Sequence, residues 1–254
     1  MVAWCAKISS MPVRYRLFIT GTDTDVGKTE VACALLHLAR EKNLSTAAMK
    51  PVAAGCELLN DSKGKQEWHN ADAIRLQQQC SIPLSYAEVN PIALKKAIAP
   101  HLAAYEENRT ITVERLVGLT QNLLMKKADF TVIEGAGGWR VPISHRELMS
   151  QYVQQLNISP HKTPVLLVAG IRLGCINHIL LTVEAIARDN VPFVGWVANC
   201  IDKDMPAMIE NIQTLERLLP IPCLGIIPFQ KNIQTEVIAA NIKFDLLLTQ
   251  LNKI

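Results

Sequence analysis

The chain has 254 residues, of which 49% are hydrophobic, so it is long and apolar enough for one large α/β core. Its net charge is only +3, and no basic stripe suggests nucleic acid as a partner. The sequence has no run of 18 apolar residues and no apolar signal-peptide core, so we expect no membrane partner and a cytoplasmic location. The seven scattered cysteines form no C-x-x-C pair, which argues against a disulfide framework and a zinc site.

The chain is expected to hold a single domain. Residues 1–10 have no clear periodicity, and we predict that residues 1–13 form a disordered extension. Residues 14–254 then make up the domain.

A phosphate-binding loop is predicted near the start of this domain. Residues 16–20 are strand-like, and apolar residues at helical spacing predict a helix over 28–42. The segment between them, GTDTDVGKT, would direct backbone N–H groups at an anion from a helix N-terminus. The strict pattern G-x-x-x-x-G-K-[ST] is missed by one residue, because Thr22 stands where glycine is expected and Gly21 precedes it. The alternative is an ordinary strand-to-helix turn.

Three residues of this loop have separate expected roles. Gly27 lets the backbone approach the phosphates, the Lys28 ammonium reaches the terminal phosphate oxygens, and the Thr29 hydroxyl completes a Mg²⁺ shell. The chain is therefore predicted to bind a nucleoside triphosphate.

Apolar, strand-like runs alternate with helical stretches along the rest of the chain. The predicted strands are 46–49, 130–133, 165–169, 193–198 and 224–227. The predicted helices are 71–80, 112–127, 177–189, 206–219 and 242–251. This alternation predicts an α/β fold, a P-loop NTPase-like parallel sheet with helices on both faces.

Polar residues stand directly after several predicted strands. Lys50 follows the second strand, Glu134 follows the strand at 130–133, and Asn199 follows the strand at 193–198. Ligands of open parallel sheets bind outside the carboxyl ends of the strands. We therefore expect these residues and the phosphate loop to converge on one crevice.

Glu134 is a candidate Mg²⁺ ligand or water anchor. It lies in VIEGAGG, where three glycines let a backbone approach a ligand. Mg²⁺ prefers a few oxygen ligands and keeps waters, so Thr29, Glu134 and Asp72 would make a plausible shell. Asp72 equally suits a purely structural role, because an acid near a helix start stabilises the helix N-terminus.

Lys50 would supply a second cation beside Lys28, although a routine surface lysine is the alternative. Two ammonium groups facing a transferring phosphoryl group would offset the charge on its oxygens. This pairing favours phosphoryl transfer over nucleotide storage.

The segment GIRLGCINHILLTVEAI combines a glycine loop with a helix predicted to be capped near Asn177. Free N–H groups of residues 174–177 could hold a carboxylate, and a plain helix cap is the alternative.

Six segments occur in a specific order, namely GTDTDVGKT, MKPVAAG, NAD, VIEGAGGW, RLGCINHILLT and GWVAN. In this order the chain resembles the dethiobiotin synthetase family of biotin biosynthesis, over roughly residues 14–229. The resemblance implies a homodimeric, ATP-dependent ligase that closes a ureido ring on 7,8-diaminopelargonic acid with carbon dioxide. In that family a substrate amine first captures carbon dioxide as a carbamate, ATP phosphorylates the carbamate, and the neighbouring amine attacks the mixed anhydride, releasing phosphate.

The resemblance also assigns residues to roles. Lys28 and Lys50 are implied as catalytic groups, and Thr29, Asp72 and Glu134 as the residues that organise Mg²⁺. ATP binding is implied for Asp25, Val26, Gly27, Lys28, Thr29, Glu30, Asp72, Glu134, Gly135, Ala136, Gly137, Asn199, Pro228, Phe229 and Gln230. Among these, Asn199 would contact the adenine and residues 228–230 would line its pocket. Substrate binding is implied for Lys50, Ala54, Gly137, Leu173, Gly174, Cys175, Ile176 and Asn177. The turn at 173–177 would take the substrate carboxylate from the opposite subunit.

The chain departs from the usual family pattern at three positions. Ala54 replaces a hydroxyl residue, Ala99 replaces the serine before Pro-His, and Cys200 replaces the aspartate of Asn-Asp. Each change removes a potential polar contact, and a hydrogen bond to a charged group is worth about 1.5–3 kcal/mol. We expect an active enzyme with altered substrate affinity.

Two other classes compete with this interpretation. An ATP-driven switch of the partition or cell-division type would carry an extra lysine early in the loop, where this chain has Thr22 and Asp23. The synthetase half of a glutamine-dependent cobyrinate-type amidase would need a large glutaminase domain, for which 254 residues leave no room.

Overall fold

The computed structural model describes residues 14–60, 64, 66–158, 161–231 and 234–254. The predicted extension at residues 1–13 lies outside the described residues and stays a prediction. Within the described ranges, no helix is long and apolar enough to cross a bilayer.

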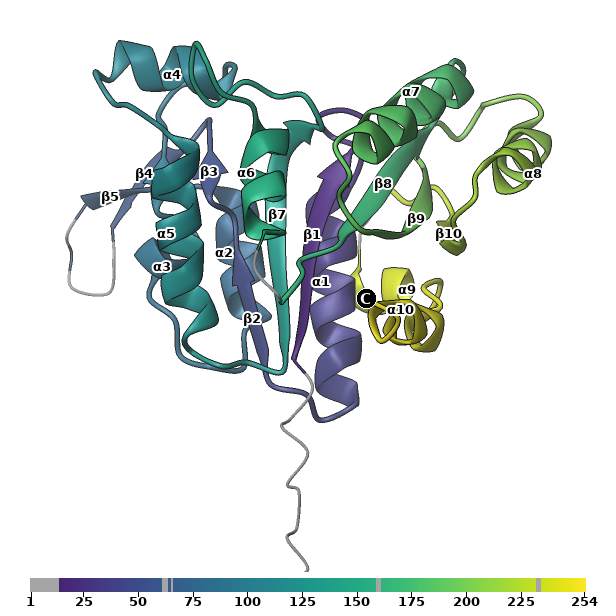
Figure 1. The fold of residues 1–254 in the computed structure, drawn as a ribbon, viewed down its shortest axis with the longest axis horizontal. Coiled ribbons are helices and arrows are strands. Elements are labelled where there is room, and N and C mark those ends of the chain that lie inside the picture. Colours follow the sequence, from purple (N-terminus) through teal and green to yellow (C-terminus); the bar gives the residue numbers. More distant parts are fainter. Residues whose placement is uncertain (1–13, 61–63, 65, 159–160, 232–233) are drawn as a thin grey trace, which may run out of the picture.

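A parallel six-stranded sheet forms the centre of the molecule, in the order β10-β9-β8-β1-β7-β2 (Figure 1). Its strands are β1 (Tyr15–Gly21), β2 (Thr46–Met49), β7 (Phe130–Gly138), β8 (Val165–Ile171), β9 (Phe193–Cys200) and β10 (Cys223–Ile227). β8 is buried along its whole length, as expected for a parallel strand covered on both faces. The predicted α/β fold is confirmed.

Two helical layers cover the sheet (Figure 1). One layer contains α1 (Lys28–Glu41), α2 (Ala71–Gln78), α9 (Thr235–Ala239) and α10 (Phe244–Leu251). The other contains α5 (Val113–Leu124), α6 (Met149–Leu156), α7 (Cys175–Arg188) and α8 (Met208–Leu218). Side chains of β1 point alternately to the two faces of the sheet. Leu17 and Ile19 pack in the core beneath α1, and Phe18 packs with α5 and α6 on the other face. The strand that leads into the phosphate loop is thus fixed from both sides.

Three predicted boundaries near the site were wrong. β7 continues to Gly138 instead of ending at Ile133, because β1 keeps pairing with it as far as Gly21 opposite Gly138. Glu134 therefore lies within the strand and does not follow it. α7 begins at Cys175, two residues before the predicted start, and its cap is Gly174 in the left-handed region at φ 89° instead of Asn177. β9 likewise extends through Asn199 to Cys200.

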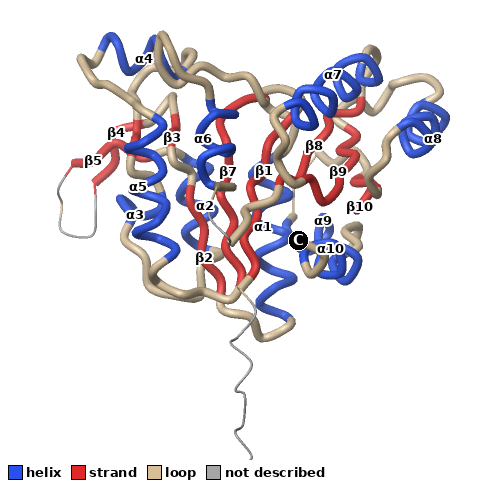
Figure 2. Tube along the Cα trace, in the orientation of Figure 1, coloured by secondary structure: helices blue, strands red, loops and turns tan. Residues whose placement is uncertain are grey.

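Short elements that the sequence did not predict surround one end of the sheet. β3 (Val52–Ala53) pairs with β6 (Ile92–Ala93), and β4 (Glu57–Asn60) pairs with β5 (Gln66–His69) in a hairpin that stands apart from the central sheet (Figure 2). Two short helices, α3 (Tyr86–Val89) and α4 (Pro100–Glu106), complete this region. These elements carry the chain from β2 past the site and back to the sheet.

Candidate functional site

The phosphate loop runs from the end of β1 to the start of α1. Gly27 adopts the left-handed region at φ +88°, and a Cβ there would lie 2.2 Å from Asn199 Nδ2, so only glycine fits. The Asn199 amide donates a hydrogen bond to Val26 O at 2.9 Å, and the Thr22 hydroxyl accepts one from Gly170 N at 3.2 Å. Two neighbouring strands therefore brace the loop.

Lys28 lies in the first turn of α1 and is almost completely buried. Its ammonium donates to Asp23 O at 2.7 Å, which holds it under the loop. Burial lowers the pKa of Lys28, while the nearby Glu134 carboxylate acts in the opposite direction. An anion bound in the loop would restore the balance of charge at this buried cation.

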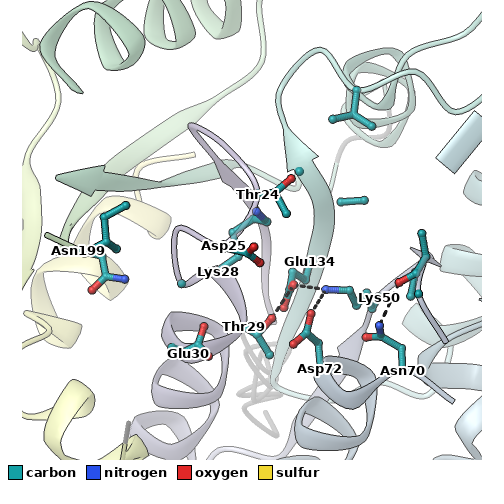
Figure 3. A pocket seen from close by; sticks show the side chains of 18 of the residues that line it. Thr24, Asp25, Lys28, Thr29, Glu30, Lys50, Asn70, Asp72, Glu134 and Asn199 are labelled. Carbon is teal, nitrogen blue, oxygen red and sulfur yellow. Dashed lines mark hydrogen bonds and ion pairs between the residues drawn. The ribbon is translucent and has the colours of Figure 1, made fainter. Parts of the chain in front are cut away.

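Glu134 is the centre of a compact cluster of charged and polar side chains (Figure 3). Its side chain is fully buried, and Oε1 accepts hydrogen bonds from Thr29 Oγ1 at 2.8 Å and from Lys50 Nζ at 2.5 Å. Lys50 Nζ also donates to Asp72 Oδ2 at 2.8 Å. Residues from α1, β7, α2 and the end of β2 thus meet at one point, as predicted.

The two carboxylates control the protonation of Lys50. Burial alone would lower the pKa of Lys50, but the charges of Glu134 and Asp72 outweigh it and raise the pKa above its usual value. For Asp72, burial acts to raise the pKa, while the Lys50 charge and hydrogen bond prevail and lower it. Lys50 stays an ammonium and Asp72 a carboxylate at neutral pH.

The donor set fits a Mg²⁺ ion shared with phosphates. Glu134 Oε2 is buried and has no hydrogen-bond partner among the described residues, so it has a free coordination position. The Thr29 hydroxyl and the Asp72 carboxylate lie on either side of this group (Figure 3). The described residues contain no cluster of three His, Cys, Asp or Glu ligands, and a site with two carboxylates and a hydroxyl is typical of Mg²⁺ held jointly with substrate phosphates.

A cavity of about 1050 Å³ opens above this cluster. It brings together most residues predicted to bind ATP, namely Asp25, Gly27, Lys28, Thr29, Glu30, Asp72, Glu134, Ala136, Gly137, Asn199, Pro228, Phe229 and Gln230. Two residues that were predicted to bind ATP, Val26 and Gly135, are not among the described residues that line the cavity. Val26 packs in the core, and Gly135 in β7 faces the ring of Phe18 in β1.

The other end of the cavity has an apolar wall. It includes Ala54 after β3, Ala97, Ile98 and Ala99 before α4, and Val141. Ala99 is the N-cap residue of α4, where its methyl group cannot accept the hydrogen bond that a serine side chain would. This departure therefore removes a helix cap.

The turn between β8 and α7 lies apart from this cavity. Leu173 is 81% exposed and Asn177 is exposed, and none of residues 173–177 is among the described residues lining the cavity. The neighbouring Arg172 forms an ion pair with Asp23 of the phosphate loop at 2.8 Å. Within one chain the structure therefore does not bring the predicted carboxylate-binding turn to the other substrate residues.

Several site residues were missed by sequence reasoning. Asn70 lines the cavity and is the N-cap of α2, where its side chain accepts a hydrogen bond from Ala73 N at 3.3 Å. An Asn directly before a helical run is a readable cap signal, so Asn70 could have been found. Ala97 and Ile98 could not, because their position depends on the β3–β6 pairing, whereas Ala99 was singled out only through the family resemblance.

The comparisons with known proteins agree with this arrangement. A family model described as an AAA domain matches residues 15–237. The chain resembles the GDP complex of the signal recognition particle receptor FtsY from Elizabethkingia anophelis, with a TM-score of 0.55, 13% identity and coverage of 97% of this chain and 66% of that one. It also resembles the MinC:MinD complex of Aquifex aeolicus, with a TM-score of 0.54, 13% identity and coverage of 94% and 95%. At these identities the likeness concerns the fold alone.

The fold and the site define a P-loop nucleotide-binding enzyme. The ATP-dependent dethiobiotin synthetase of Cellvibrio japonicus is 53% identical over 211 residues, which cover 83% of this chain and 88% of that protein. The synthetase of Pseudomonas aeruginosa PAO1 is 48% identical over 225 residues, which cover 89% of this chain and 94% of that protein. The chain therefore belongs to the ATP-dependent dethiobiotin synthetase family, and it is an ATP-dependent ligase as the resemblance implied.

Proposed function

We propose that this protein closes the ureido ring of dethiobiotin on 7,8-diaminopelargonic acid, using carbon dioxide and ATP, in the cytoplasm. The observation that carries the proposal is the Lys50 ammonium held between Glu134 and Asp72, next to the phosphate loop and facing a cavity with an apolar far wall. This geometry combines phosphate binding with a second cation at the point where an acceptor would meet the terminal phosphate.

The proposed reaction has three steps. One amine of the substrate attacks carbon dioxide and loses a proton, giving a carbamate. A carbamate oxygen then attacks the γ-phosphorus of ATP, the bond to the β-phosphate oxygen breaks, and ADP leaves. The second amine finally attacks the carbonyl carbon of the mixed anhydride and loses a proton to solvent, the ring closes, and phosphate leaves.

Lys28 and Lys50 supply the charge stabilisation for these steps. Lys28, at the start of α1, binds the β- and γ-phosphate oxygens together with the loop N–H groups. Lys50 faces the carbamate and the transferring phosphoryl group, where its charge offsets the charge that develops on their oxygens. The salt bridges to Glu134 and Asp72 fix the ammonium before substrate arrives, so little reorganisation is needed at the moment of transfer.

Thr29, Asp72 and Glu134 are proposed to hold Mg²⁺, which when bound would neutralise charge on the phosphates. The unpartnered Glu134 Oε2 supports this role. Asn199, Pro228, Phe229 and Gln230 are proposed to receive the adenine, because all four line the cavity. Asn199 lies on the side of the loop away from Lys50 (Figure 3).

A homodimer is proposed to complete the substrate site. Leu173, Gly174 and Asn177 of the turn at 173–177 are exposed, and the turn does not line the cavity of its own chain. Leu173, and Leu181 in α7, expose large apolar side chains. The Cys175 N–H already donates to Arg172 O at 2.9 Å, so the N–H groups of Gly174, Ile176 and Asn177 are the candidates. A second copy that covers the apolar side chains would bring these groups to the substrate carboxylate. The expected oligomer is therefore part of the active site.

The test is phosphate release from ATP and Mg²⁺ in bicarbonate buffer, with and without 7,8-diaminopelargonic acid, with mass detection of the product. Release that depends on the diamine and yields dethiobiotin would establish the proposed function. Hydrolysis that ignores the diamine, or none at all, would contradict it and favour an ATP-driven switch.

A further inference from the structure

A buried polar network holds the backbone of Lys50. Asn90, at the end of α3, is only 3% exposed, and its Nδ2 donates to Lys50 O at 2.7 Å and to Ile92 O at 3.4 Å. The Lys50 N–H donates to Val89 O at 2.7 Å. Both backbone polar groups of residue 50 are therefore held by the end of one short helix.

Tyr86 connects Asn90 to the start of α2. Its hydroxyl donates to Asn90 Oδ1 at 2.9 Å and accepts from Asn70 N at 2.7 Å. The Tyr86 ring stacks on His69, with centroids 3.9 Å apart and an interplanar angle of 7°. The Tyr86 hydroxyl is therefore both a donor and an acceptor, and stacking on His69 holds its ring in place.

These contacts close a circuit around the charged cluster. α2 carries Asp72 two residues after Asn70, and the Asp72 carboxylate bonds the Lys50 ammonium at 2.8 Å. The side chain of Lys50 thus touches α2 directly, while its backbone is tied to the start of α2 through Asn90 and Tyr86. These hydrogen bonds fix Lys50 and Asp72 relative to each other in two ways, through the side chain of Lys50 and through its backbone.

We propose that Tyr86 and Asn90 are positioning residues for the phosphoryl-transfer step, which hold the Lys50 ammonium and the Asp72 carboxylate at their working separation. The inference rests on the proposed function of Lys50. A misplacement of about 1 Å at a reacting group can lower the rate by about 100-fold. Neither Tyr86 nor Asn90 is among the described residues that line the cavity, so they act through Lys50 and Asp72.

The Tyr86 hydroxyl suits this role over a wide pH range. Burial raises the pKa of Tyr86 to about 12, so the hydroxyl keeps the proton that it donates to Asn90. Phenylalanine would keep the stacked ring but leave Asn70 N–H and Asn90 Oδ1 without this partner. Tyr86→Phe is therefore a small change that removes only the two hydrogen bonds that link Asn90 to the start of α2.

The matched control is Tyr152→Phe. Tyr152 is fully buried in α6, and its hydroxyl shares a hydrogen bond of 2.5 Å with Thr120 in α5. This variant also removes one phenol hydroxyl from a hydrogen bond, but in the other helical layer. Both variants should lose thermal stability, and only Tyr86→Phe should affect the reaction.

The experiment measures steady-state kinetics and amide hydrogen exchange for both variants beside the wild-type protein. For Tyr86→Phe we expect kcat to fall by about 10-fold or more, as when other groups that support a reacting side chain are removed, with the KM for ATP within about twofold of wild type. Exchange should rise in residues 66–74, around the start of α2, and stay unchanged there in Tyr152→Phe. This local rise is a readout that general destabilisation would not reproduce.

Two outcomes would overturn the inference in different ways. An active wild type with an unimpaired kcat in Tyr86→Phe would leave these residues a structural role only, and the proposed function would stand. A wild type that shows no diamine-dependent phosphate release would overturn the proposed function and this inference with it.

Discussion

The cluster around Glu134 and the turn between β8 and α7 are built in opposite ways. Lys28, Thr29, Lys50 and Glu134 are all buried and joined by short hydrogen bonds to one another or to the loop. The turn at 173–177 contributes an exposed leucine and an exposed asparagine and lies outside the cavity. One chain therefore contains a finished charged cluster, which we propose carries out phosphoryl transfer, and an unfinished region at this turn, which we propose binds a carboxylate.

This difference follows from the cost of burying charge. An unpaired ammonium or carboxylate in a protein interior is strongly destabilising, and Lys50, Glu134 and Asp72 meet this cost by pairing with one another within the chain. Backbone N–H groups at a helix start carry no full charge and can remain exposed to water until a partner covers them. The Lys50–Glu134–Asp72 cluster is thus assembled within one chain, whereas the neutral part of the proposed site can wait for the proposed second copy.

The largest effect is expected from Lys50→Gln, which removes the central charge of the finished region. Losing one group that stabilises the transition state lowers kcat by about 10²–10³-fold. ATP affinity, measured by calorimetry, should change little because Lys28 and the loop still hold the phosphates. Phosphate release with the diamine would report the loss of turnover.

Lys96→Gln is the control for this substitution. Lys96 is exposed and pairs with Glu106 at 2.6 Å, and exposed pairs contribute about 1 kcal/mol or less. Its turnover should match that of wild type. Unimpaired turnover in Lys50→Gln would remove Lys50 from the mechanism and with it the contrast between the two regions.

The charged cluster could be predicted from the sequence, whereas several features around it could not. The phosphate loop and the cluster of Lys28, Lys50 and Glu134 followed from local patterns, because strand ends of a parallel sheet meet at one edge. The end of β7 and the start of α7 could not be predicted from local patterns. β7 is extended by pairing with β1, and α7 starts where Gly174 takes a left-handed conformation, neither of which periodicity reveals.

The position of the cavity wall was also beyond the reach of local patterns, although the family resemblance had pointed to Ala54 and Ala99. Ala97 and Ala99 come to the site because β3 and β6, about forty residues apart, pair through only two residues each. The Tyr86–Asn90 network depends on the same long-range folding of the segment between β2 and α4. Short elements of this kind have too few residues for a periodic signal.

The next largest effect is expected from Leu173→Asp, which alters the unfinished region. If a second copy covers this side chain, a charge placed there should weaken the dimer by about 2 kcal/mol, or roughly 30-fold in its dissociation constant. Analytical ultracentrifugation should show more monomer, and the KM for the diamine should rise at low enzyme concentration. ATP binding should be unchanged, because the phosphate centre lies within one chain.

Met125→Asp serves as the matched control, since Met125 is 74% exposed at the end of α5, far from α7 (Figure 1). This variant should keep the wild-type oligomer and kinetics. A Leu173→Asp protein that stays dimeric with a wild-type KM for the diamine would count against the shared site.

The smallest effect is expected from Ala54→Ser, which changes the apolar wall that joins the two regions. Ala54 lines the cavity, and its carbonyl accepts a weak hydrogen bond of 3.4 Å from Asn70 Nδ2. A serine hydroxyl there could bond the carbamate or an amine, and a hydrogen bond to a charged group is worth about 1.5 kcal/mol at the low end. The KM for the diamine should therefore fall by about tenfold or less, while kcat and the KM for ATP stay unchanged.

Ala97→Ser places the same hydroxyl on the facing part of the wall, where residues 96–98 are exposed and carry no predicted substrate contact. If only Ala54→Ser lowers the KM, a hydroxyl at residue 54 bonds the substrate specifically, and this chain, with alanine there, binds its substrate through the charged cluster and the turn alone. If both variants lower it equally, the wall responds to general polarity and the position of residue 54 has no special meaning. If neither does, the alanine costs no affinity, and the two regions already supply the whole of the recognition.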